Sequence, residues 1–212
     1  IYVHFWELST EAMRWLSPVM LLGLPFSAIM APHLTRLIDK RTVLLIFGSW
    51  VILNANILIM LRLFTDVLPD NGDPWLLYIL LSFGFVTGLV TPALLITFNS
   101  MFADIADELE LRTGARQEGI IFSARSFGFK ASAAMATVLG GIALDLIGFP
   151  RGAEVGEVPD EIVFRLGLVA APATIVIGMA NLMFFTAYRL DRARVAEIQV
   201  ELSKRRAAAA EN

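Results

Sequence analysis

The stretch Pro74-Trp-Leu-Leu-Tyr-Ile-Leu-Leu-Ser-Phe-Gly-Phe-Val-Thr-Gly-Leu-Val-Thr-Pro-Ala-Leu-Leu-Ile-Thr-Phe-Asn-Ser-Met-Phe-Ala103 carries no charged side chain. It is longer than the about 20 apolar residues that an α-helix needs to cross the roughly 30 Å hydrocarbon layer of a bilayer. Four other stretches are also long and apolar enough, and none shows the alternation of a strand. The sequence therefore predicts an all-α membrane protein with five transmembrane helices. The predicted spans are residues 15–35, 42–61, 75–101, 120–148 and 166–188.

The composition of the whole chain agrees with this fold class. Of 212 residues, 57% are hydrophobic and 17% are charged, whereas soluble domains carry about 25% charged residues. The chain has no cysteine, and it contains neither a phosphate-binding Gly-Lys loop, nor a zinc-protease motif, nor a nucleophile elbow. We therefore expect no enzyme, no catalytic residues, no metal site and no cofactor, and the net charge of −3 gives no reason to expect nucleic acid.

The distribution of charge between the spans predicts the orientation in the membrane. Cytoplasmic connections retain an excess of Lys and Arg. On one side the connections carry Arg36, Lys40, Arg41, Arg112, Arg116, Arg189, Arg192, Arg194, Lys204, Arg205 and Arg206. On the other side a few arginines stand among Asp66, Asp70, Asp73, Glu154, Glu157, Asp160 and Glu161. The prediction is a multi-pass protein of the cell (plasma or inner) membrane with its N-terminus outside and its C-terminus in the cytoplasm.

Two basic residues, Arg125 and Lys130, lie within the fourth predicted span. A charged residue at mid-membrane costs about 2.5–3.5 kcal/mol on insertion scales and is a functional candidate by default. One interpretation places both side chains in a water-filled cavity that binds a polar solute. The alternative is that the membrane-crossing part begins near Phe127 and both side chains reach back to the cytoplasmic interface. Their five-residue separation turns them roughly 140° apart on a helix, so we do not expect them to share one contact.

Polar side chains on the second and third spans are further candidates for a cavity lining. They are Trp50, Asn54 and Thr91. Hydrogen bonds between neighbouring helices are the alternative role for each of them. Small residues at four-residue spacing, Gly84 with Gly88 and Ser132 with Ala136 and Gly140, predict close helix packing instead of ligand contact.

The connection between the third and fourth spans is the most distinctive stretch. It reads Ala103-Asp-Ile-Ala-Asp-Glu-Leu-Glu-Leu-Arg-Thr-Gly-Ala-Arg-Gln-Glu-Gly119. Glu108 and Arg112 form an i,i+4 pair of the favourable order, and Gly114 is suited to a left-handed helix cap. One interpretation is a solvated helical loop. The other is an ionic latch that holds cytoplasmic elements together in one state and releases them in another.

This pattern, A-D-x-x-D-x-x-x-x-x-T-G-x-R-x-E-G between two apolar helices, resembles the signature between helices ten and eleven of a transporter family. The family is the glycoside-pentoside-hexuronide:cation symporters, the melibiose permease branch of the major facilitator superfamily. Residues 36–41 resemble the basic loop after its eighth helix, residues 5–10 the outer connection before that helix, and residues 189–206 its charged tail. The resemblance thus covers nearly the whole chain.

The resemblance implies a fold and a set of site residues. The spans would be helices eight to twelve of a twelve-helix carrier, with residues 1–188 as the C-terminal transmembrane bundle and 189–212 as a cytoplasmic tail. Lys130 would face the central cavity, which favours a substrate role for it. The cytoplasmic latch would consist of Asp104, Asp107, Arg116 and Glu118, with Arg36, Lys40 and Arg41 from the basic loop. Glu108 and Leu109 depart from the family pattern, and so does Arg125, which replaces an uncharged amide and could change solute preference.

The expected function is cation-coupled symport, with Na⁺ or H⁺, of a sugar or glycoside by alternating access. Two alternatives remain: a carrier of a lipid-like or organic-anion solute, and a five-span membrane scaffold without a solute. The first residue is Ile, and we expect the chain to begin within a longer protein. The partners would then be the solute, the lipid bilayer and an N-terminal half that holds most of the coupling-cation site.

The charged tail leaves two arrangements open. Val195, Ile198 and Leu202 could face lipid while the arginines of the tail face anionic headgroups. A helix surrounded by water is the alternative.

Overall fold

The computed structural model describes residues 1–188 and 190–210. In that part of the chain all regular structure is α-helical. The helices are α1 (Thr10–Leu37), α2 (Lys40–Phe64), α3 (Pro74–Thr113), α4 (Glu118–Leu146), α5 (Asp160–Phe185) and α6 (Arg192–Ala210). The first five are long and apolar enough to cross a membrane, which confirms an all-α, multi-pass membrane protein. Of the predicted tail, Arg189, Glu211 and Asn212 lie outside the described residues.

The helix boundaries follow from local sequence. The side chain of Ser9 accepts a hydrogen bond from the backbone N–H of Ala12 at the start of α1. Asp73 does the same for Trp75 at the start of α3, where proline occupies the first turn. Gly114 ends α3 in the left-handed conformation with φ 73°, as its position in the sequence predicts. The fifth helix ends at Phe185, three residues before the end of the predicted span 166–188, so Tyr188 lies after the helix.

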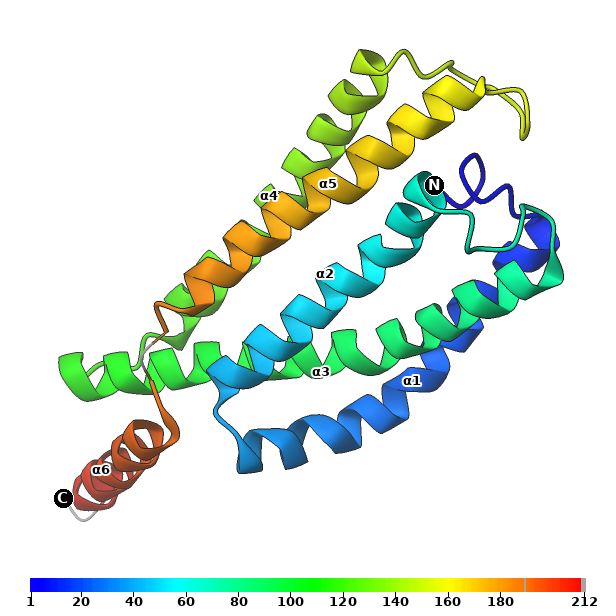
Figure 1. Cartoon of the computed structure of the whole chain (residues 1–212). Coiled ribbons are helices and arrows are strands. Elements are labelled where there is room, and N and C mark those ends of the chain that lie inside the picture. The colour runs from blue at the N-terminus through cyan, green and yellow to red at the C-terminus, as the bar shows by residue number, and fades with distance from the viewer. Residues whose placement is uncertain (189, 211–212) are drawn as a thin grey trace.

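The third helix is the centre of the arrangement. It contacts α1, α2, α4 and α6, while α5 packs against α2 (Figure 1). Because α3 has 40 residues, it is roughly 60 Å long, about twice the hydrocarbon thickness. Its last turns, with the first carboxylate at Asp104, therefore extend past the crossing segment.

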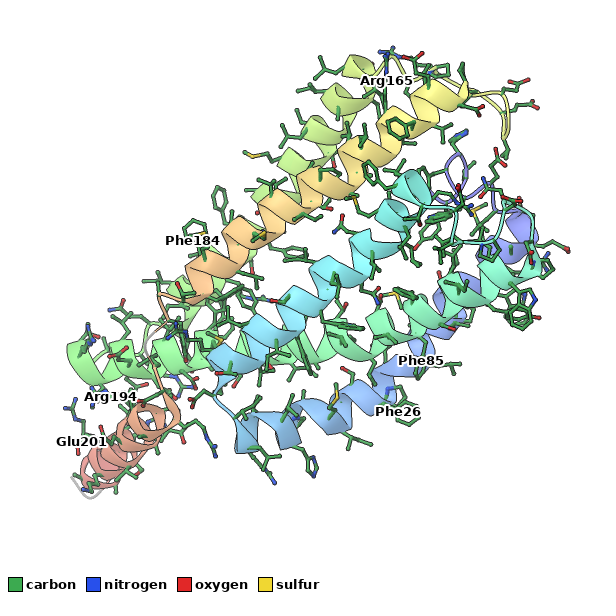
Figure 2. The ribbon with its side chains drawn as sticks, viewed as in Figure 1. Phe26, Phe85, Arg165, Phe184, Arg194 and Glu201 are labelled. Atoms are coloured by element: carbon green, nitrogen blue, oxygen red, sulfur yellow. The ribbon has the colours of Figure 1, made fainter. Side chains whose placement is uncertain are left out.

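The contact between α1 and α3 is very close. A Cβ added to Gly88 would lie 1.8 Å from the backbone oxygen of Met20, and one added to Gly23 would lie 2.4 Å from the carbonyl carbon of Gly88. Phe26 and Phe85 then meet edge to face across the same two helices (Figure 2). The predicted packing role of Gly88 is confirmed, whereas nothing lies within 4 Å of the corresponding position at Gly84.

The two ends of the bundle differ in chemistry. We call one end the acidic end, because the connections rich in Asp and Glu lie there. At this end residues 1–9 fold over the bundle. Phe5, Trp6 and Leu8 are buried in a cluster with Leu58, Ile59, Leu76, Leu80 and Ala171. The guanidinium of Arg62 lies over the ring of Trp6 at 5.4 Å. The opposite end, which we call the basic end, is where α1, α3 and α5 finish, α2 and α4 begin and α6 lies (Figure 1).

The fourth helix stands apart from the others. None of its residues is buried, and among the helices of the described chain it makes its main contact with α3. The predicted small-residue stripe has no packing partner here, since nothing lies within 4 Å of a Cβ at Gly140. The packing role predicted for this stripe therefore stays a prediction.

Candidate functional site

A buried ion pair joins α2 to α3 at the basic end. Lys40 Nζ donates to both carboxylate oxygens of Asp104, at 2.8 and 2.6 Å. The side chain of Asp104 is 5% exposed and that of Lys40 is 21% exposed. Lys40 is the first residue of α2, and Asp104 directly follows the apolar run of α3. This pair brings together two of the predicted latch residues from segments 64 positions apart.

Tyr188 is the third member of this contact, and sequence reasoning missed it. Its hydroxyl donates to Asp104 Oδ2 at 2.9 Å. The carboxylate of Asp104 therefore links α2, α3 and the segment after α5, because it accepts hydrogen bonds from a charged donor, Lys40, and from a neutral one, Tyr188. We call Lys40, Asp104 and Tyr188 the basic-end node. Hydrogen bonds to an ionised group are stronger than those between neutral groups. A small number of such bonds in the node can therefore hold the three segments together.

The tail helix α6 is fastened to the extended end of α3. Arg206 Nη2 donates to both oxygens of Glu110, at 3.1 and 3.0 Å, and Arg205 Nη1 donates to the carbonyl of Leu111 at 2.9 Å. Ile198 and Leu202 are buried, and α6 packs against α3. The two predicted arrangements of the tail, lipid-facing or fully solvated, are therefore wrong for these apolar residues. They are covered because α3 continues far enough beyond the bilayer to offer a partner.

The other predicted latch residues do not join the node. Arg116 pairs with its near neighbour Glu118 at 2.7 Å, and this bond raises the pKa of the arginine. Arg36 and Arg41 make no ion pair with another described residue. Arg41 instead lines a cavity of about 490 Å³ together with Asp39, Thr42, Leu45, Tyr188, Leu190 and Asp191. The predicted Glu108–Arg112 pair is present at 2.6 Å.

Asp107 lies in the same projecting part of α3, between the node and the tail contact. Partial burial raises the pKa of Asp107, and the nearby carboxylates of Glu110, Asp104 and Glu118 act in the same direction. The positive charge of Arg206 opposes the shift. Asp107 is therefore held near a cation of the tail without forming an ion pair with it in the described chain.

Arg125 and Lys130 line one groove between α3 and α4. Its volume is about 310 Å³, and its walls are Leu95, Asn99, Arg125, Ser126, Phe129 and Lys130. Both side chains thus border the same groove, while the expectation that they do not share one contact stays a prediction. The Nε atom of Arg125 is buried without a hydrogen-bond partner, and its guanidinium lies 6.0 Å from the ring centre of Phe102.

The other candidate cavity residues lie elsewhere. Trp50 lines a separate apolar groove between α2 and α3. Asn54 accepts a hydrogen bond from the hydroxyl of Thr87 at 2.9 Å, which is the interhelical role considered as the alternative. The hydroxyl of Thr91 is buried without a partner in the described chain. The structure thus brings Arg125 and Lys130 together and places Trp50, Asn54 and Thr91 outside their groove.

Comparison with known proteins identifies the family. The model of the MFS/sugar transport protein family matches residues 2–192. The "Uncharacterized 29.9 kDa protein in crtE 3'region" of Pseudescherichia vulneris is 26% identical over 202 residues, 94% of this chain and 68% of that protein. The "Putative glycoside/cation symporter YagG" of Escherichia coli strain K12 is 27% identical over 205 residues, 97% of this chain and 41% of that protein. The chain thus spans less than half the length of the second relative.

The family match agrees with the helices of the structure. It covers the five helices that are long and apolar enough to cross a membrane and ends at the start of α6. A transport family is also what the resemblance of residues 103–119 led us to expect. The chain belongs to the MFS/sugar transport protein family, which makes it a multi-pass transporter protein and not an enzyme.

Proposed function

We propose that the chain forms the C-terminal half of a secondary carrier that moves a sugar or glycoside together with Na⁺ or H⁺. The family membership and the printed description of the symporter relative, of which the chain matches 41%, support this proposal. The basic end would face the cytoplasm, because Lys and Arg gather there, and residues 1–9 would lie outside. Most of the coupling-cation site would lie in the other half of the carrier.

The observation that carries the proposal is the basic-end node. Alternating access requires helix groups to move against one another around a central site. A contact that closes one end must be strong enough to hold and polar enough to be replaced by water when that end opens. Lys40, Asp104 and Tyr188 meet both needs, since the carboxylate is nearly buried while the lysine stays partly exposed.

Alternating access also needs a site that can bind a polar solute. The groove between α3 and α4 offers polar side chains for such a site beside apolar helices. Arg125, Ser126 and Lys130 from α4 face Asn99 from α3 there. These side chains offer hydrogen-bond donors and acceptors of the kind that sugar hydroxyls need. In this proposal the groove is part of the solute path, and opening of the node exposes it to the cytoplasm.

The test is solute uptake into vesicles that contain the intact carrier. Labelled methyl glucoside and related glycosides should accumulate when an inward Na⁺ or H⁺ gradient is imposed, and accumulation should stop when an ionophore collapses that gradient. Uptake that is the same with and without either gradient would overturn the coupling. Lack of any uptake or binding would favour the scaffold interpretation instead.

A further inference from the structure

Four of the five helices that are long enough to cross a membrane form two closely packed pairs (Figure 1). In the first pair, α1 and α3 meet through the close glycine contact described above. In the second pair, a Cβ added to Gly178 of α5 would lie 2.6 Å from Cγ1 of Ile52 in α2. The hydroxyl of Thr174 in α5 also donates to Oδ1 of Asn56 in α2 at 2.7 Å. Dense packing resists displacement, so each pair behaves as one body.

The contact between the two pairs is more open along its middle. A groove of about 390 Å³ lies between α2 and α3, and Trp50 of α2 and Val90 of α3 are among its walls. Beside it, a hydrogen bond of 2.9 Å from the hydroxyl of Thr87 to Oδ1 of Asn54 joins the same two helices. The pairs therefore meet across a surface that leaves space between them, and the contacts at its two ends decide whether they can tilt against each other.

At the basic end the fastening is the polar basic-end node, whereas at the acidic end it is apolar. We call residues 1–9, which lead into α1, the strap. Its side chains Phe5, Trp6 and Leu8 are 2–7% exposed. They are packed with buried residues of both pairs, which are Leu76 and Leu80 of α3, Leu58 and Ile59 of α2 and Ala171 of α5.

The strap is also the place where α5 is buried most deeply. The buried residues of α5 are Gly167 and Ala171, both in the half that begins at the acidic end. A Cβ added to Gly167 would lie 2.6 Å from Cε2 of Phe5. The amide of Asn71, in the connection between α2 and α3, donates to the carbonyl of Phe5 at 3.2 Å. The strap thus joins the second pair to the first through side-chain packing and through its backbone.

The two fastenings differ in how they respond to water. Water can replace the hydrogen bonds of the node when the basic end opens, so the node can be released and formed again. Separation of the strap from the helices would expose Phe5, Trp6 and Leu8, and apolar surface gains no compensating partner in water. The acidic end of this chain is therefore the end that resists opening.

We propose that the strap is a pivot, about which α2 and α5 tilt together against α1 and α3. The acidic end stays closed, and the basic end opens when the node breaks. A tilt of about 10° about the acidic end would move the basic end of α2, which has 25 residues and is roughly 38 Å long, by about 7 Å. The inference rests on the proposed function, because a pivot serves a carrier whose basic end opens and closes.

The test measures one distance between the pairs at each end. Spin labels are attached to cysteines in the intact carrier, from which any other cysteines have been removed, and the distances are measured by pulsed electron paramagnetic resonance. The basic-end labels replace Phe184 of α5 and Leu37 of α1, and the acidic-end labels replace Phe164 of α5 and Trp15 of α1. All four side chains are exposed, at 42–77%. Asp104→Asn weakens the node and so favours the open basic end.

We expect Asp104→Asn to change the basic-end distance by up to about 7 Å and the acidic-end distance by less than about 2 Å, as a tilt about one end implies. Addition of Trp6→Ala should broaden the acidic-end distances as well, because the strap then loses its largest buried side chain. Trp75→Ala removes an indole at the same end that is 69% exposed, and it serves as the matched control.

The outcomes separate the pivot from the function. Equal changes at both ends with an intact strap, or no change at the basic end, would overturn the pivot and leave the carrier proposal standing. If thermal unfolding shows that Trp6→Ala is not folded, Asn71→Ala takes its place, since it removes a hydrogen bond to the strap. Acidic-end distances that stay narrow in the folded strap variant would also overturn the pivot. Absence of gradient-driven uptake, with distances that change as expected, would count against the proposed function alone.

Discussion

The two sides on which α3 meets its neighbours within the membrane differ sharply. On the α1 side, Gly23 and Gly88 let the backbones approach so closely that a Cβ at Gly88 would overlap the backbone of Met20. On the α4 side, no residue of α4 is buried, and the interface contains grooves of about 310 and 490 Å³. One side is a tight backbone contact, whereas the other is loosely packed.

The difference indicates which parts of the bundle move together. Dense packing resists displacement, because every shift breaks many contacts at once. We therefore expect α1 and α3 to move as one body. α4 loses few contacts when it moves, and it is the helix that carries Arg125 and Lys130 into the groove. The two cations thus lie at a loosely packed interface.

The largest expected effect comes from disrupting the close backbone contact between α1 and α3. Gly88→Ala places a methyl group 1.8 Å from the oxygen of Met20, so α1 and α3 must separate. We expect a loss of about 3 kcal/mol or more in the free energy of unfolding, at the upper end for overpacked sites. Denaturant titration in detergent micelles measures it. Gly84→Ala, where nothing lies within 4 Å, is the control and should change stability by less than about 1 kcal/mol.

An intermediate effect is expected at the basic-end node, where a polar contact fastens the end of α3 to α2. Lys40→Met keeps the aliphatic stem and removes the charge, which leaves Asp104 nearly buried with Tyr188 as its remaining partner. The cost should be about 2 kcal/mol of unfolding free energy. Arg36→Met removes a cation at the same end that has no ion pair in the described chain. Equal destabilisation by both substitutions would mean that the node contributes nothing specific.

The smallest effect belongs to the tail contact. The side chain of Arg206 is 53% exposed and that of Glu110 is 15% exposed, so water weakens their attraction. A double-mutant cycle with Arg206→Ala and Glu110→Ala should give a coupling energy of about 0.5 kcal/mol. The buried Ile198 and Leu202 would then hold α6 in place more firmly than the ion pair does. A coupling energy above about 2 kcal/mol, the loss expected for Lys40→Met, would contradict this order of effects.

The fold could be predicted from the sequence because long uncharged runs have few physical alternatives. The run 74–103, for example, lies entirely within α3. The individual contacts could not be predicted to the same extent. Asp104 and Lys40 were both expected at a latch, but their pairing depends on where α2 begins relative to the end of α3. Tyr188 was missed because it lies after the helix end, and its role depends on how that turn returns to α3.

The groove shows a second limit of sequence reasoning. Angular spacing on one helix separates Arg125 from Lys130, yet the position of α3 beside α4 makes both of them line one surface. Likewise Ile198 and Leu202 form an apolar pair whose partner could not be known until the length of α3 beyond the membrane was fixed. In both cases the deciding information is the placement of a second helix.

The most direct test of the account is whether the basic-end node controls access to the groove. Since the 212 residues contain no cysteine, Ser126→Cys introduces the only thiol of this chain at the groove wall, and labelling of the unsubstituted carrier gives the background. A membrane-impermeant maleimide is applied from the side of the basic end, and its labelling rate is compared between the Ser126→Cys carrier and the same carrier with Asp104→Asn. We expect up to about tenfold faster labelling when the node is broken, as release of roughly 1.4 kcal/mol allows. An unchanged rate would contradict it.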